Sequence, residues 1–168
     1  MTQSVSTAAR VPGPLSVFGL SLVATVLVVD QASKFVAERT LDFGRTIDLL
    51  PILSLLRVHN TGVAFSLGND LGSLVLVAGT AFITLFVLYL WRTAQDGGRL
   101  VAAGFALIVG GALGNLIDRI RFGHVVDFLY LHFGARGFFV FNLADVALTL
   151  GPILLGWFYL LGGRKASA

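Results

Sequence analysis

The chain contains no cysteine and few charged residues. None of its 168 residues is a cysteine, and Asp, Glu, Lys and Arg together make up 12%. The lack of cysteine excludes disulfides, thiol nucleophiles and thiolate metal ligands, and it leaves the redox compartment undetermined. The low charge accompanies an apolar share of 56% and a mean hydropathy of +0.87, whereas soluble domains have roughly 45–50% apolar residues. The composition therefore indicates a membrane protein.

Several common catalytic motifs are also missing. The sequence has no Gly-x-Ser-x-Gly nucleophile motif and no His-Glu-x-x-His metalloprotease motif. Its three histidines do not follow a familiar zinc spacing, although His124, Asp127 and His132 leave a metal site open as an alternative. We expect no metal and no cofactor. The net charge is +3, but the basic residues are scattered singly at the ends of apolar runs, so we expect no nucleic-acid partner.

Four apolar runs predict four membrane-spanning helices, because a helix needs about 20 residues to cross the hydrocarbon core. The first run follows a polar head, as in a secretory signal peptide, but no small-x-small cleavage site comes after it, so we expect an uncleaved helix. Four spans place both termini on one side, and Pro152 predicts a kink in the fourth span. The predicted spans are about residues 15–36, 71–91, 100–117 and 138–161.

The expected fold class is a mainly α membrane protein, with residues 1–168 in one integral membrane domain. Two long connections, 37–70 and 118–137, lie on the side opposite the termini. In the first of them, β-branched and apolar residues are interrupted by Pro51 and by an Asn-Thr-Gly turn. This pattern predicts a small sheet over about residues 42–68 rather than a separate soluble domain.

The basic residues bear on the orientation of the chain. Of the 12 Lys and Arg residues, seven lie on the side of the two long connections, six of them within those connections and Lys34 just before the first, and five lie in the termini and the short connection 92–99. The raw count favours cytoplasmic long connections, but the five residues occupy a much shorter stretch of chain. Acidic residues accompany most of the seven, although acids count little under the positive-inside rule. We expect cytoplasmic termini.

Ionisable groups within or beside spans are costly, so each requires an explanation. Asp30 and Lys34 are four residues apart with the acid first, which is the favourable order for a helical ion pair. Such a pair either neutralises the end of the helix or anchors a functional site. Asn60 and Gly62 form either a simple turn or a binding segment, since the glycine can take a positive φ.

The end of the third span combines small and polar residues. Gly110 and Gly114 form a small-xxx-small face, which allows another helix to approach closely. Asn115, Asp118 and Arg119 share one helical face. We interpret Asp118 as a structural ion-pair partner of Arg119 rather than as a catalytic acid.

Two further acids have apolar neighbours. Asp127 lies in a Val-Val-Asp-Phe run, and Asp145 follows the apolar residues 138–141, so both are candidates for perturbed pKa values. Singly, Asp145 could be an acid stabilised by a helix N-terminus, and Asp127 a loop acid paired with His124 or Arg136. Those interpretations do not explain why two such acids occur on segments that meet on one side of the bilayer.

Two carboxylates in contact share a proton, so that one acts as general base and the other as general acid. This chemistry hydrolyses a peptide bond without a covalent intermediate. If the fourth helix begins near Phe141, Asp145 lies about 6 Å along it, at the shallow edge of the hydrocarbon, with Asn142 on the same face. The alternatives are a small proton-coupled transporter or channel subunit, with acids spread across the membrane, and a membrane scaffold built on the glycine face.

Five polar blocks occur in an order and at span positions that resemble the lipoprotein signal peptidases, also called signal peptidase II. The resemblance covers the chain from the first span onward. The blocks are Asp30-Gln31 with Lys34, Asn60-Thr61-Gly62-Val63-Ala64-Phe65, Gly114-Asn115-Leu116-Ile117-Asp118-Arg119, Val125-Val126-Asp127-Phe128 and Phe141-Asn142-Leu143-Ala144-Asp145.

The resemblance implies an aspartic endopeptidase of the bacterial inner membrane, multi-pass, with cytoplasmic termini and an extracytoplasmic active site. Its implied substrates are prolipoproteins that carry diacylglycerol on a cysteine, cut immediately before that cysteine. Besides these substrates it implies membrane lipid as a partner, and we expect a monomer. It also implies that the predicted sheet is a β-cradle, which covers the site together with a periplasmic helix.

The resemblance also assigns site residues by position. Asp127 and Asp145 match the catalytic pair. The residues expected to bind substrate or to support the site are Asp30, Lys34, Asn60, Gly62, Asn115, Asp118, Arg119, Asn142 and Ala144.

Overall fold

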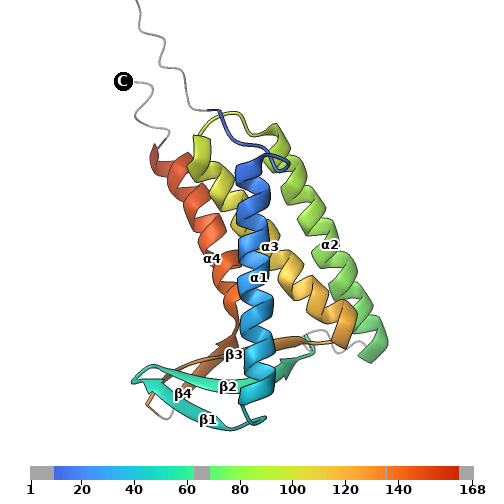
Figure 1. The fold of residues 1–168 in the computed structure, drawn as a ribbon, viewed down its shortest axis with the longest axis vertical. Coiled ribbons are helices and arrows are strands. Elements are labelled where there is room, and N and C mark those ends of the chain that lie inside the picture. Colours follow the sequence, from blue (N-terminus) through green and yellow to red (C-terminus); the bar gives the residue numbers. More distant parts are fainter. Residues whose placement is uncertain (1–9, 63–68, 135, 163–168) are drawn as a thin grey trace, which may run out of the picture.

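The computed structural model describes residues 10–62, 69–134 and 136–162. Within them, four helices are long and apolar enough to cross a membrane, as the sequence predicts (Figure 1). A π-helical turn, η2, continues the last of them over Trp157–Gly162. The helices are α1 (Val17–Thr40), α2 (Asn69–Thr93), α3 (Gly98–Phe122) and α4 (Leu143–Gly156).

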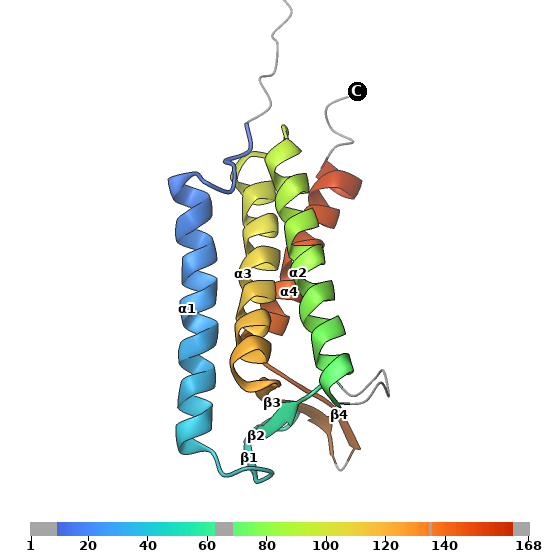
Figure 2. The ribbon, with the colours of Figure 1, turned by 90° about the vertical axis from the view of Figure 1, so that its right-hand side faces the viewer.

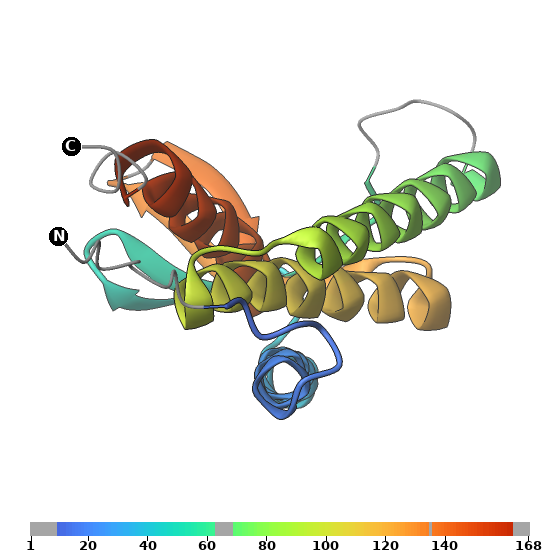
Figure 3. The ribbon, with the colours of Figure 1, turned by 90° about the horizontal axis from the view of Figure 1, so that it is seen from above.

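Helix α3 forms the centre of the bundle and contacts α1, α2 and α4 (Figure 3). Of its membrane-spanning window, 61% is buried, compared with 17%, 11% and 17% in the other three helices. Those three helices leave large apolar side chains on the outside, such as Phe82 and Ile153, where lipid would surround them. The bundle is therefore organised around one buried helix.

Glycines on α3 allow its neighbours to approach closely. A Cβ atom at Gly110 would lie 2.8 Å from the side chain of Val26 in α1, and one at Gly104 would lie 2.8 Å from Leu155. At Gly114, a Cβ atom would meet the carboxylate of Asp30. The predicted small-residue face thus serves packing against α1, with Gly104 serving the same purpose against the C-terminal helix.

Helices α1 and α3 extend beyond the spans predicted for them. The first continues to Thr40 instead of 36, and α3 continues to Phe122 instead of 117, where Gly123 ends it with a φ of 75°. Hydropathy marks where a helix leaves the hydrocarbon, whereas its backbone hydrogen bonds continue into the polar last turns. The extension of α3 carries Asp118 and Arg119 of the polar site described below.

The predicted start of the fourth span at residue 138 is wrong. Arg136–Phe141 form strand β4, and the helix begins at Leu143 with Asn142 as its N-cap. A short apolar run rich in Phe and Val suits a strand as well as a buried helix, so periodicity does not separate the two. Pro152 lies inside α4.

An antiparallel sheet closes the end of the bundle opposite the first turn of α1 and the last turn of η2 (Figure 2). The predicted sheet is present, but the described part of the first long connection supplies only half of it. The other half comes from the second long connection. The strands are β1 (Thr46–Leu50), β2 (Leu53–Asn60), β3 (Val125–Phe133) and β4, in that order across the sheet.

Part of the expected cradle, residues 63–68, lies outside the described residues. The periplasmic helix implied by the resemblance does not occur in residues 41–62 or 123–134.

Candidate active site

Asp127 and Asp145 meet where β3, β4 and the first turn of α4 converge. Asp127 is 2% exposed within the sheet, and Asp145 is half-buried in the first turn of α4. Asn142 joins them: its side-chain Nδ2 donates to Asp127 Oδ1 at 2.6 Å, and its backbone N–H donates to Asp145 Oδ2 at 3.2 Å. The structure therefore brings the two predicted acids onto opposite sides of one asparagine.

The second oxygen of Asp127 is bound by a residue from the first long connection. Asn60 Nδ2 donates to Asp127 Oδ2 at 3.0 Å, and Asn60 Oδ1 accepts from the backbone N–H of Gly62, also at 3.0 Å. Gly62 has a φ of 70°, which favours glycine. The two interpretations of this segment combine, because the turn orients the amide that contacts the acid.

Asp145 is held from two helices. Asn115 in α3 donates through Nδ2 to Asp145 Oδ1 at 2.8 Å. The Asn142 side chain caps α4 by accepting from the backbone N–H of Asp145 at 3.0 Å, which completes a reciprocal capping box. Asn115 Oδ1 accepts from Lys34 Nζ at 2.9 Å and from Asn142 Nδ2 at 3.2 Å. Each amide orientation follows from donors at one end and acceptors at the other.

A buried cluster of three charged residues, Asp30, Lys34 and Asp118, supports the site. Lys34 lies 2.9 Å from Asp30 and 3.0 Å from Asp118, and none of the three side chains is more than 3% exposed. Asp30 accepts the backbone N–H of Ala144 at 2.9 Å, and Asp118 accepts that of Val126 at 3.2 Å. The cluster thus fixes the chain one residue before each of the two candidate catalytic acids.

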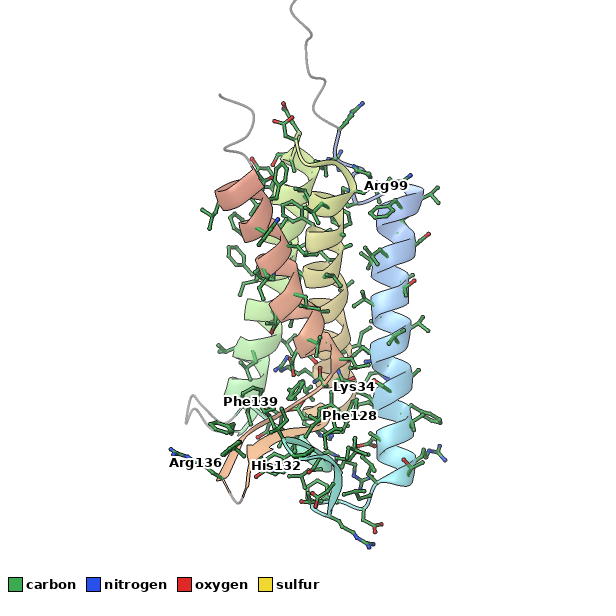
Figure 4. All side chains as sticks on the ribbon, turned by 90° about the vertical axis from the view of Figure 1, so that its left-hand side faces the viewer. Lys34, Arg99, Phe128, His132, Arg136 and Phe139 are labelled. Carbon is green, nitrogen blue, oxygen red and sulfur yellow. The ribbon has the colours of Figure 1, made fainter. Side chains whose placement is uncertain are left out.

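The predicted Asp30–Lys34 pair is present, but the predicted Asp118–Arg119 pair is wrong. Neighbouring residues on a helix point in different directions, and Asp118 pairs with Lys34 of α1 instead. Figure 4 shows Lys34 at the level where the helices meet the sheet, with Arg99 at the other end of the bundle.

Arg119 approaches the acids without forming an ion pair among the described residues. Its Nη1 reaches only the carbonyl oxygen of Asn115, at 3.5 Å, and its Nε is buried without a hydrogen-bond partner in this part of the chain. Asp145, Asp127 and Asp118 are the carboxylates within electrostatic range of its guanidinium. The guanidinium of Arg119 therefore has N–H groups left to donate beside the two acids.

Gln31 is a site residue that the sequence analysis did not identify. Its Nε2 donates to Asp118 Oδ1 at 2.9 Å and lies 3.3 Å from the carbonyl oxygen of Gly114. The sequence could have indicated this role, because Gln31 follows Asp30 near the end of an apolar span. A side-chain amide at that position requires a hydrogen-bond partner, just as an acid does.

Burial raises the pKa of Asp127 to about 6, from 3.8, and the charge of Asp145 acts in the same direction. Hydrogen bonds from Asn60 and Asn142 and the charge of Lys34 oppose this rise, because they favour the carboxylate. Asp127 therefore keeps a proton up to about pH 6, which an ordinary surface aspartate does not.

The single-residue explanations for the two acids fit less well. Asp127 hydrogen-bonds to two asparagines, whereas His124 stacks on His59 and Arg136 is exposed in the β3–β4 hairpin. The macrodipole explanation for Asp145 is compatible with its capping position, but it leaves the hydrogen bond from Asn115 unexplained.

The alternative metal site of His124, Asp127 and His132 does not form among the described residues. His132 Nε2 lies 2.7 Å from the hydroxyl of Ser54. Successive side chains of a strand point to opposite faces of the sheet, so His132, which is an odd number of residues after Asp127 in β3, points to the other face.

An ion path across the membrane would need acids at several depths. The buried acids of the described residues all lie at the sheet end of the bundle, and they are Asp30, Asp118 and Asp127. This distribution does not suit a transporter or channel.

Comparison with known proteins identifies a family. The model of the family described as "Signal peptidase (SPase) II" matches residues 22–161. A lipoprotein signal peptidase of Mesorhizobium japonicum is 42% identical over 144 residues, which cover 86% of each chain. One of Brucella ovis is 43% identical over 146 residues, covering 87% of this chain and 91% of the relative.

Solved structures share the fold. A bacterial membrane enzyme determined by the in meso method at 2.3 Å resolution superposes with a TM-score of 0.77 and 28% identity, covering 95% of this chain and 96% of the other. A second, at 1.9 Å resolution, gives a TM-score of 0.72 and 30% identity over 81% and 88% of the chains. With a membrane-spanning bundle, a small sheet and a family match over most of its length, the chain belongs to the signal peptidase II family of peptidases.

Proposed function

We propose that this peptidase is an aspartyl endopeptidase that removes signal peptides from prolipoproteins carrying diacylglycerol on a cysteine, cutting immediately before that cysteine. One observation carries the aspartyl assignment: Asn142 hydrogen-bonds to both carboxylates, to Asp127 through its side chain and to Asp145 through its backbone. The names of the relatives support the substrate class.

In the proposed reaction Asp127 supplies the proton, because its pKa is raised to about 6. Asp145 accepts a proton from a water molecule, and the resulting hydroxide attacks the scissile carbonyl carbon. Asp127 donates its proton to the carbonyl oxygen as the tetrahedral intermediate forms. When the C–N bond breaks, the proton held by Asp145 passes to the leaving amine, and Asp127 recovers the proton of the intermediate's hydroxyl group.

The amide network keeps this geometry in place before substrate arrives. Asn142 and Asn115 occupy the acceptor positions of the two carboxylates that face the protein. Preorganised groups of this kind lower the barrier because they need not reorganise during the reaction. The proposal gives Arg119 the role of stabilising negative charge that develops beside the acids.

The depth of the two acids suits a lipid-anchored substrate. Asp145 lies in the first turn of α4, at the edge of a span, and Asp127 lies in the sheet outside it. Acyl chains on the substrate cysteine would hold the scissile bond at the interface, so the peptide need not enter the hydrocarbon centre. We further propose cytoplasmic termini, a site at the extracytoplasmic face of the inner membrane and a monomeric enzyme. A reporter enzyme that works only outside the cytoplasm, fused to the C-terminus, should be inactive. Activity of this fusion would contradict the proposed orientation.

The substrate assignment is tested with purified full-length enzyme in phospholipid vesicles. A prolipoprotein with diacylglyceryl-cysteine is compared with the same polypeptide lacking the lipid, and the products are identified by mass spectrometry. We expect one cut, before the lipidated cysteine, and little cleavage of the unlipidated control. A cut elsewhere, or equal cleavage of both, would overturn the proposed specificity.

A further inference from the structure

A second group of side chains, which carry potential metal-ligand atoms, lies apart from the charge cluster and the candidate catalytic acids. Glu38, His59 and His124 place one ligand atom each within 4.8 Å of one another. His59 Nε2 lies 2.9 Å from Glu38 Oε1, and the rings of His59 and His124 stack with centroids 3.8 Å apart. The side chains of His59 and Glu38 are 35% and 40% exposed, so solutes can reach the group.

The three residues come from three different elements. Glu38 lies in the last turn of α1, His59 near the end of β2, and His124 in the two-residue connection between α3 and β3. A surface ion pair accounts for Glu38 with His59, but it does not require a second imidazole. One carboxylate and two imidazoles form a donor set that Zn²⁺ takes in proteins, with a fourth position left for water.

We propose that Glu38, His59 and His124 bind a divalent transition metal, with Zn²⁺ as the preferred ion. Zinc–ligand bonds of about 2.0–2.2 Å in a tetrahedron place ligand atoms about 3.4 Å apart. The three ligand atoms here lie within 4.8 Å of one another, so the widest separation has to shorten as the ion binds. The ion must lie in the plane of each imidazole, which requires the stacked rings to turn. The His124 ring can turn by rotation about its side-chain bonds, because the residue lies outside the helix and the strand, in the connection between α3 and β3.

Neighbouring contacts hold two of the ligands in position. Arg57 Nη1 donates to the carbonyl oxygen of Glu38 at 2.5 Å, which leaves the carboxylate to His59. The Arg57 guanidinium lies over the ring of Phe43, and that ring contacts the edge of His59 with centroids 5.0 Å apart. A bound ion would join the end of α1 to β2 and to the α3–β3 connection. It would therefore raise the thermal stability of the protein.

The proposal is tested on the purified full-length protein in detergent, with Co²⁺ as a spectroscopic probe and Zn²⁺ as competitor. We expect one Co²⁺ per chain with the visible absorption of a tetrahedral site, displacement by one equivalent of Zn²⁺, and a rise in Tm with Zn²⁺. None of these readouts depends on the proposed peptidase activity.

Substitutions locate the ion. His59→Gln and His124→Gln each remove one imidazole, and each should weaken metal binding by more than the roughly 10–100-fold that loss of an outer-shell partner costs. His132→Gln is the matched control, because this remaining histidine lies in the β3–β4 hairpin and contacts Ser54 (Figure 4). We expect it to bind Co²⁺ as the wild type does. Tm values measured without metal establish that the variants are folded.

Three results would overturn the proposal. They are the absence of stoichiometric Co²⁺ binding, unchanged affinity in His124→Gln, and an equal loss of affinity in His132→Gln. If His59→Gln fails to fold, the comparison of His124→Gln with His132→Gln decides the question alone.

Discussion

Asn142 both caps helix α4 and contacts the two candidate catalytic acids. It is the N-cap of α4, it donates to Asp127, and its backbone N–H binds Asp145. The sequence predicts that it shares a helical face with Asp145, and the capping box explains why that spacing matters. A residue that starts a helix and orients two acids links local folding directly to the candidate chemistry.

Asn142→Ala removes both the cap and the hydrogen bond to Asp127. We expect about 1 kcal/mol of lost stability from the cap and a fall in kcat by on the order of 100-fold, because the two acids lose their common anchor. Ser16→Ala is the matched control, since Ser16 caps α1 at the other end of the bundle. It should cost similar stability with unchanged kcat, and equal kcat losses in both variants would contradict the role of Asn142.

The pH dependence of cleavage reports the proton on Asp127. With a pKa of about 6, Asp127 is protonated below that pH and ionised above it, so kcat/KM should fall as pH rises through about 6. Asn60→Ala removes a hydrogen bond that favours the carboxylate, so its pKa should rise and the alkaline limb should move to higher pH. Ser54→Ala, in the same strand but without contact to Asp127, should leave the limb in place. A limb that moves to lower pH in Asn60→Ala would contradict this assignment.

At the scale of elements, helix α1 supports the site through a buried cluster centred on Lys34. Lys34 neutralises Asp30 and Asp118, which in turn bind the backbone at the start of α4 and of β3. Lys34→Met leaves these buried carboxylates without a cation, so we expect a loss of roughly 3–5 kcal/mol, measured as a lower Tm. Arg45→Met breaks the exposed Asp42–Arg45 pair and should cost at most about 1 kcal/mol. Similar losses in the two variants would contradict the buried cluster as a support.

The contact between α1 and α3 depends on Gly114. Gly114→Ala would place a methyl group against the Asp30 carboxylate, and overpacking of this kind costs about 1–3 kcal/mol. Gly79→Ala in α2 meets no atom within 4 Å, so it should leave Tm unchanged or slightly higher. Cleavage should fall only in the first variant, and a stable, active Gly114→Ala enzyme would contradict close packing here.

The elements themselves were predictable to different degrees. Apolar runs of span length identify the four helices, because the bilayer fixes how long such runs must be. Strand β4 was missed, since Phe138–Phe141 has no periodicity that separates a strand from a helix. Pairing of β2 with β3 joins residues far apart in the chain, and no local pattern specifies that register. Strong local signals were thus recovered, whereas long-range pairing was not.

At the scale of the whole molecule, the buried ionisable side chains of the described residues gather at the sheet end of the bundle, whereas the outer faces of its helices are largely apolar. The sequence analysis selects Asp30, Lys34 and Asp118, because each polar residue beside a span needs a partner, but it misses Gln31. It predicts the Asp30–Lys34 pair but not the other partners. Asp118 was assigned to Arg119 but pairs with Lys34, because helix packing decides which side chains meet.

The central claim is that Asp127 and Asp145 act as one catalytic pair, and single-turnover cleavage of a diacylglyceryl-modified prolipoprotein tests it most directly. The enzymes compared are the wild type, Asp127→Asn, Asp145→Asn and the exposed-acid control Asp42→Asn, all reconstituted in the same vesicles. Each catalytic substitution should lower the rate by about 10²–10⁴-fold, the usual contribution of a general acid or base, while Asp42→Asn cleaves at the wild-type rate. Cleavage at the wild-type rate by either Asp127→Asn or Asp145→Asn would contradict the account.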